Sequence, residues 1–171
     1  MLRILPGEKI PANMFETLDG HDWPGAEFTA PRFRLLVVYR GVQCSYCRKQ
    51  LIELNAKMPA LAERNVSVIA VSADSKARAQ QAVDEWRLDR LRLGFNLSIE
   101  AARRMGLYIS AASREAEMPY FSEPGLFLIA PDQTLFASWI SSYPFARPHL
   151  DEIVEGIDFI LENKRPPRGN N

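Results

Sequence analysis

Three short, dense apolar runs along the chain predict strands that are buried on both faces. They lie at residues 33–39, 66–71 and 126–130, and the second is strongly β-branched. Residues 134–140 instead alternate in polarity after a turn at Pro131-Asp132-Gln133, which predicts an antiparallel partner for the third run. A weaker, shorter strand is predicted at residues 92–96.

Helical spacing of apolar residues follows each of the first two predicted strands. Leu51, Leu54, Met58 and Leu61 recur at intervals of three and four within residues 45–64, so they share one helical face. Pro59 interrupts this pattern and is expected to kink the helix or divide it in two. Further helices are predicted at residues 76–88, at residues 99–105 after the capping Ser98, and in a last amphipathic stretch that Pro148 introduces.

The ends of the chain and one inner stretch carry weaker patterns. Residues 1–32 are predicted to be an N-terminal extension, with a β-hairpin that turns at Asp19-Gly20 between residues 15–18 and 21–23 and a loop at residues 24–32. The polar residues 164–171 predict a flexible tail. Residues 107–123 are ambiguous, with a helical turn expected at residues 113–118.

The order of these elements predicts an α/β protein. Two successive β-α-β units favour a parallel central portion, and the final pair of strands adds an antiparallel edge. No internal repeat and no linker divides the sequence, so residues 1–171 are expected to form one domain.

Composition and charge exclude several functional classes. The 171 residues include 21 basic and 21 acidic side chains, and this balance does not favour binding to nucleic acid or to an anionic membrane. The apolar runs are too short to cross a bilayer, and the N-terminus lacks the features of a secretion signal. We therefore expect a cytoplasmic protein.

The chemistry of the chain is concentrated in its two cysteines. Cys44 and Cys47 form a C-x-x-C motif between a predicted buried strand and a predicted helix. The helix start, the nearby Arg40 and Arg48, and the lack of any acidic residue between Phe33 and Ile52 all favour a thiolate, which is the nucleophilic form. Alternatives are a pair of inert buried thiols, or half of a zinc site, for which only His21 and His149 remain besides carboxylates.

Three stretches around this motif resemble one protein family. Tyr39-Arg40-Gly41-Val42-Gln43-Cys44-Ser45-Tyr46-Cys47-Arg48 is similar to the R-G-x-W-C-P-Y-C-R pattern of peroxiredoxin-like proteins. Residues 68–75 are similar to the family's strand ending in V-S-x-D, and residues 124–132 to its strand and hairpin after the active-site loop. The chain thus resembles the alkyl hydroperoxide reductase/thiol-specific antioxidant family of the thioredoxin superfamily. The resemblance implies a thioredoxin-like fold, with a central mixed β-sheet flanked by helices, and redox chemistry without a cofactor or metal.

The sequence also departs from the family pattern P-x-x-x-T-x-x-C. Aligned on Cys47, Arg40 replaces the proline, Cys44 replaces the threonine, and Pro124 stands where the family has a peroxide-binding arginine. Pro124 is similar to the cis-proline that thioredoxins place against their C-x-x-C; the alternative is an ordinary trans proline in a loop. Arg40, Arg114 and Arg147 are all candidates to substitute for the missing arginine. The resemblance therefore implies Cys44 and Cys47 as catalytic residues, supported by Arg40, Tyr46, Arg48 and Pro124.

Two classes of function follow. In the first, the chain is a thiol–disulfide oxidoreductase or a thiol peroxidase. By analogy with thioredoxin, Cys44 attacks a protein disulfide and Cys47 resolves the mixed disulfide; by analogy with peroxiredoxin, Cys47 attacks a peroxide and Cys44 condenses with the sulfenic acid. An external thioredoxin-like or glutathione-like thiol then reduces the resulting disulfide. In the second, it is a non-catalytic redox sensor or interaction module. There Trp139, Tyr143 and Phe145 would form a partner surface or a homodimer contact, although core and loop packing is the simpler expectation.

Overall fold

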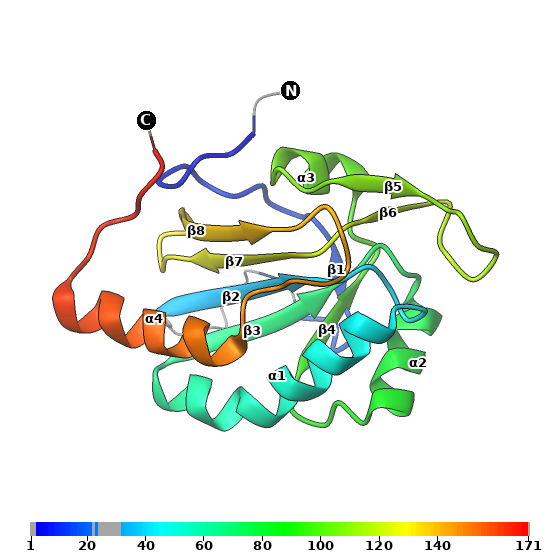
Figure 1. Cartoon of the computed structure of the whole chain (residues 1–171), viewed down its shortest axis with the longest axis horizontal. Helices are drawn as coiled ribbons and strands as arrows, with labels where there is room; N and C mark the ends of the chain where they lie inside the picture. Colours follow the sequence, from blue (N-terminus) through cyan, green and yellow to red (C-terminus); the bar gives the residue numbers. More distant parts are fainter. Residues whose placement is uncertain (1–2, 22, 24–31, 171) are drawn as a thin grey trace.

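A mixed sheet of six strands forms the centre of the computed structural model, which describes residues 3–21, 23 and 32–170 (Figure 1). The strand order is β1-β4-β3-β2-β7-β8. The bounds are β1 Glu16–Thr17, β2 Phe33–Val38, β3 Val66–Val71, β4 Arg92–Phe95, β7 Gly125–Ile129 and β8 Leu135–Ile140. β2, β3 and β4 run parallel, whereas β1, β7 and β8 pair antiparallel with their neighbours. The predicted mixed sheet, parallel at its centre with an antiparallel edge, is therefore confirmed.

Helices cover both faces of this sheet (Figure 1). α1 (Ser45–Glu63), α2 (Lys76–Trp86) and α4 (Leu150–Asn163) contribute to an apolar cluster that includes Leu35 and Val37 of β2. α3 (Ile99–Arg104) and the N-terminal segment contribute to a second cluster, which includes Leu36 and Val38. Alternate residues of β2 thus enter two separate cores, and this explains why the strand is apolar except at Arg34.

Four loops meet at one end of the strands, the end at which β2 and β3 finish. Val38 pairs with both Val71 and Gly125, and Gly125 also pairs with Ile140. The chain therefore leaves β2, β3 and β8, and enters β7, at the same end of the strands. Both cysteines lie at this end because α1 follows β2. The carboxyl ends of parallel strands are the usual place for a site in an α/β sheet.

The N-terminal hairpin differs from its prediction. Glu16 of β1 lies opposite Phe95 of β4, so β1 extends the main sheet as a partner of β4. The predicted turn is present, since the Gly20 N–H donates to the Thr17 carbonyl at 3.2 Å. Addition of β1 satisfies backbone groups at the edge of β4, which a short local hairpin would leave unpaired. Residue 22 and most of the predicted loop, residues 24–31, lie outside the described residues.

Two inner segments also differ from their predictions. α1 is one helix that contains Pro59, so division of the helix there is wrong. Pro59 is exposed, and its ring leaves the buried face of Leu51, Leu54 and Leu61 undisturbed. The ambiguous stretch forms a second, two-stranded sheet of β5 (Ile109–Ala111) and β6 (Tyr120–Ser122). The stretch 113–118, where a helical turn was expected, is the loop between these strands and holds one hydrogen-bonded turn, in which the Glu117 N–H donates to the Arg114 carbonyl at 3.1 Å. Among the described helices, none is both long and apolar enough to span a membrane.

Candidate active site

Cys44 forms the start of α1. It is the N-cap residue, with φ −92° and ψ 107°, and its Sγ accepts a hydrogen bond from the Cys47 N–H at 3.2 Å. The turn into the helix begins at Gly41, whose φ of 144° is a conformation that residues with a side chain rarely adopt. Cys47 lies one turn further on. The two cysteines are 4% and 0% exposed, so the protein controls access to both sulfurs.

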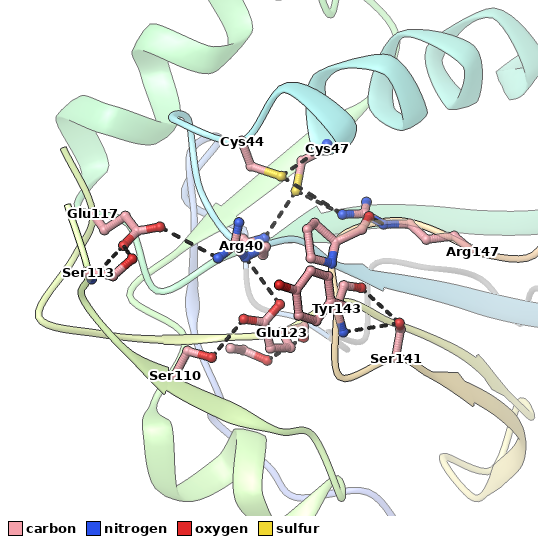
Figure 2. Close-up of polar contacts among 12 residues, drawn as sticks. Arg40, Cys44, Cys47, Ser110, Ser113, Glu117, Glu123, Ser141, Tyr143 and Arg147 are labelled. Atoms are coloured by element: carbon pink, nitrogen blue, oxygen red, sulfur yellow. Dashed lines mark hydrogen bonds and ion pairs between the residues drawn. The ribbon is translucent and has the colours of Figure 1, made fainter.

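Arg147 contacts both sulfurs (Figure 2). Its Nη2 lies 3.1 Å from the Sγ of Cys47 and 3.9 Å from the Sγ of Cys44. Its Nη1 donates to Gln50 Oε1 at 2.5 Å and its Nε to the Pro144 carbonyl at 2.7 Å, so the guanidinium is fixed on three sides. The preceding Ala146 has a left-handed φ of 58°, an unfavourable conformation for alanine that bends the loop just before this arginine. Of the three candidate arginines, Arg147 is the one whose side chain reaches the cysteine pair.

The surroundings of the two thiols push their pKa values apart. The pKa of Cys44 is lowered to about 6, first by the hydrogen bond from the Cys47 thiol, then by the Cys47 backbone N–H and the charges of Arg147 and Arg40, against the opposing effect of burial. Burial raises the pKa of Cys47, and the hydrogen bond with Cys44 raises it further. The Arg40 N–H and Arg147 also donate to the Cys47 sulfur, but two thiolates in contact would repel each other. These opposite pKa shifts favour the thiolate on Cys44 over a thiolate on Cys47.

A polar cavity of about 440 Å³ opens beside Cys44. One wall is the start of α1, a second is the hairpin of β5 and β6 with its loop, and the third is the loop after β8. Cys44 lines this cavity, and Cys47 does not. The residues that line the cavity are Arg40, Gln43, Cys44, Ser45, Tyr46, Ser110, Ala111, Ser113, Arg114, Glu117, Phe121, Glu123, Ser142, Tyr143 and Pro144. The lowered pKa and the access from the cavity thus both favour Cys44 over Cys47.

Arg40 has a different role from the one its sequence position suggested. Its Nε lies 3.1 Å from Glu123 Oε2, in an ion pair that lacks hydrogen-bond alignment, and its Nη2 lies 3.5 Å from Glu117 Oε1 (Figure 2). The guanidinium also packs over the Phe121 ring, with 4.8 Å between Cζ and the ring centroid. Arg40 therefore builds the cavity wall through its side chain and reaches the Cys47 sulfur only through its backbone N–H.

The three other residues predicted to support the site, Tyr46, Arg48 and Pro124, lie in different surroundings. Tyr46 is 48% exposed, lines the cavity and packs against Phe145 at 5.9 Å between ring centroids. Arg48 is exposed, and in the described part of the chain no contact joins its side chain to either sulfur. Pro124 is buried, accepts the Ser141 N–H at 3.0 Å and shares a second cavity with Arg147. The structure thus brings Tyr46 to the cavity beside Cys44 and leaves Arg48 outside it.

Two further residues hold the cysteine loop and were not singled out in the sequence. Asp74 is fully buried, and its Oδ2 accepts the Val42 N–H at 2.8 Å. Its Oδ1 accepts Nε of Arg78 at 2.6 Å. The available signal was the V-S-x-D stretch at the end of β3, which the resemblance had already marked. Among the described residues, no group of three or more His, Cys, Asp or Glu side chains is arranged to hold a metal ion.

Comparisons with known proteins bear on the family and the fold of the chain. Residues 6–138 match the model of the AhpC/TSA family. In fold, the chain is similar to a cysteine mutant of peroxiredoxin 6 of Arenicola marina, with a TM-score of 0.80, 18% identity, and coverage of 95% of this chain and 76% of that one. It is also similar to the reduced 2-Cys peroxiredoxin of Plasmodium vivax, with a TM-score of 0.71, 19% identity, and coverage of 93% and 98%. The thiol peroxidase of Chromobacterium violaceum gives a TM-score of 0.64 at 18% identity, with coverage of 93% and 87%. No curated protein matches the sequence.

Proposed function

The chain belongs to the AhpC/TSA family, whose members use cysteine thiols in redox chemistry, and on that premise we propose that Cys44 is its attacking thiolate and Cys47 its resolving thiol. The observation that carries this assignment is the position of Cys44. Its sulfur lines the cavity and caps the helix, whereas Cys47 is fully buried behind it. A nucleophile must be both ionised and reachable, and Cys44 meets both conditions.

With a hydroperoxide, the Cys44 thiolate attacks one oxygen and the O–O bond breaks. The alkoxide leaves and takes a proton from solvent, and Cys44 becomes a sulfenic acid. The Cys47 thiol then attacks the sulfenic sulfur, water leaves, and a Cys44–Cys47 disulfide forms. With a disulfide substrate, Cys44 forms a mixed disulfide and one thiolate leaves. Cys47 then releases the second thiol and closes the same disulfide.

Arg147 supports both routes in this proposal. Its guanidinium balances the charge of the thiolate before attack. Arg147 would thereby take the role of the family arginine, whose position in this chain is occupied by Pro124. Each cycle leaves the pair oxidised, so turnover requires an external dithiol or two small thiols, of the thioredoxin or glutathione kind. Such reductants are abundant in the cytoplasm, which is the compartment that we propose.

The test compares Cys44→Ser and Cys47→Ser variants in stopped-flow measurements of peroxide consumption. We expect Cys47→Ser to react once and to accumulate a sulfenic acid at Cys44, detected by mass spectrometry after dimedone trapping. We expect Cys44→Ser to react no faster than free cysteine. The reverse pattern would make Cys47 the attacking thiol. A wild type that consumes neither peroxide nor a small disulfide faster than free cysteine would exclude the enzymatic function.

A second candidate, a redox sensor or interaction module, is favoured by the exposed aromatic residues beside the pair. Tyr143 and Phe145 are 61% and 49% exposed, and their ring centroids lie 4.9 Å apart. Packing in the core, the simpler expectation from the sequence, therefore does not explain these two rings. A disulfide that forms readily but does not turn over with thioredoxin-like or glutathione-like reductants would support this candidate. A dimer whose formation depends on Tyr143 would further support it.

A further inference from the structure

The loop that joins β5 and β6, residues 112–119, forms one wall of the cavity beside Cys44. Ser113, Arg114 and Glu117 of this loop line the cavity. Each strand of the hairpin has only three residues, and residues 112–116 are exposed. A two-stranded hairpin of this size does not fix its own position, so the place of the loop depends on its anchors.

Arg78 of α2 is one of these anchors. Its guanidinium donates to three separate segments: Nε to Asp74 Oδ1 at 2.6 Å, and Nη2 to Gln43 Oε1 at 2.7 Å and to the Ala116 carbonyl at 2.9 Å. Gln43 directly precedes Cys44, and Ala116 lies in the loop. One planar side chain thus joins the cysteine loop to the opposite cavity wall, and its charge is held by the fully buried Asp74.

Arg40 provides a second anchor on the same loop. Its contact with Glu117 lies one residue beyond the Ala116 carbonyl. Glu117 Oε2 in turn accepts the backbone N–H groups of Ser113 and Arg114, so the loop is also tied within itself. Both arginines thus hold loop 112–119 in place as a wall of the cavity beside Cys44, which is 4% exposed.

This enclosure limits what can reach the sulfur. A reacting atom must approach within about 3–3.5 Å of Cys44 Sγ, and the disulfide of a folded protein brings the bulk of that protein with it. The cavity of about 440 Å³ is of the size that takes a small molecule. We propose that Arg78 is a specificity-determining residue, which latches loop 112–119 against the cysteine loop and so restricts the site to small disulfides and hydroperoxides while excluding protein disulfides. The same restriction applies to the reductant, so in this proposal two small thiols of the glutathione kind, and not a folded thioredoxin-like protein, reduce the Cys44–Cys47 disulfide.

This proposal rests on the proposed function, in which Cys44 attacks. The test measures two second-order rate constants for oxidation of the reduced protein, one with 2-hydroxyethyl disulfide and one with insulin. Wild type is compared with Arg78→Lys, which keeps a cation beside Asp74 but cannot contact three segments. Arg103→Lys is the matched control, because Arg103 is an exposed arginine on α3 outside the cavity lining. Arg78→Gln is a second variant with the latch fully removed.

We expect wild type to prefer the small disulfide strongly. In Arg78→Lys the rate constant with insulin, divided by the rate constant with 2-hydroxyethyl disulfide, should rise about tenfold. This is the factor expected when the loss of one charge-assisted hydrogen bond populates an open loop. Arg78→Gln should raise this ratio further, and Arg103→Lys should leave it unchanged.

Equal changes with both substrates, or a wild type that already reacts as fast with insulin, would overturn the latch. Failure of wild type with both disulfides while it still consumes a hydroperoxide would also overturn the latch, whereas failure with the hydroperoxide as well would count against the proposed function. Circular dichroism and the pH dependence of Cys44 alkylation separate unfolding or an altered thiolate from a change in access.

Discussion

Replacement of Arg147 by glutamine should raise the pKa of Cys44 and slow its reactions at acidic and neutral pH. Arg147 is the side chain that brings a full positive charge to both sulfurs, at 3.1 Å from Cys47 and 3.9 Å from Cys44. Glutamine is a polar residue that retains hydrogen-bonding capacity, so the substitution mainly removes the charge. The expected effect is electrostatic and acts on the thiolate form only.

The magnitude follows from the contacts of the guanidinium. A hydrogen bond to a charged group contributes about 1.5–3 kcal/mol, which corresponds to a pKa change of about 1–2 units. The pKa of Cys44 should therefore rise from about 6 to about 7–8. The Cys47 thiol and backbone N–H keep part of the stabilisation, so the pKa should not return fully to 9.0. For a pKa of about 7.5, the thiolate fraction at pH 6 falls roughly 15-fold, whereas at pH 9 it is almost unchanged.

The assay is the rate of iodoacetamide alkylation between pH 4.5 and 10, together with thiolate absorbance at 240 nm, in a Cys47→Ser background. Arg147→Lys is the control: it keeps the charge and should show a smaller shift. An Arg147→Gln protein whose midpoint stays within about 0.3 pH units of its Cys47→Ser parent would refute the reasoning, because the helix start would then suffice. A rate loss that persists at pH 9 would indicate a displaced loop and no electrostatic role.

Three further predictions concern the scaffold, and urea unfolding monitored by circular dichroism tests each of them. Gly41→Ala should lower the free energy of unfolding by about 1–3 kcal/mol, because φ is 144° and a Cβ would lie 2.6 Å from Gln43 Oε1; an unchanged unfolding midpoint would contradict this. Asp74→Asn should cost about 2–4 kcal/mol through the buried contact with Arg78, while the exposed Asp84→Asn should have little effect. Leu54→Ala should cost about 2–5 kcal/mol, since Leu54 is fully buried on α1, and a loss below about 1 kcal/mol would show that the site repacks.

Apolar patterning predicted the elements that form the core. β2, β3 and β7 are runs buried on both faces, and α4 carries an apolar stripe, so burial itself produced the signal. β5 and β6 gave none, because three-residue strands on the surface need neither alternation nor bulk. β1 was found, but its partner was wrong: the pairing with β4 depends on a sheet edge that is distant in sequence.

The site was predictable only where its chemistry is local. Cys44 and Cys47 were identified because a C-x-x-C between strand and helix has a mechanism at that spacing. Arg147 lies 103 residues from Cys44, and nothing in the sequence separates it from Arg40 or Arg114. Its selection requires the antiparallel pairing of β7 with β8, which returns the chain to the edge of the sheet where α1 begins. Arg48 was included for proximity in sequence alone, and the helix turns it to solvent.

The position of Cys44 at the start of α1 also has a consequence for the oxidising strength of the protein. A thiol with a pKa of about 6 in place of 9.0 is ionised at pH 7, and this stabilises the dithiol state by about 1.4 kcal/mol. The disulfide has no charge for the helix start or Arg147 to stabilise. For a two-electron couple that energy corresponds to about 30 mV, so the Cys44–Cys47 disulfide should be that much more oxidising than one formed from an unperturbed thiol. The same contacts that make Cys44 reactive therefore also make its oxidised form easier to reduce, which favours return to the starting state after each cycle.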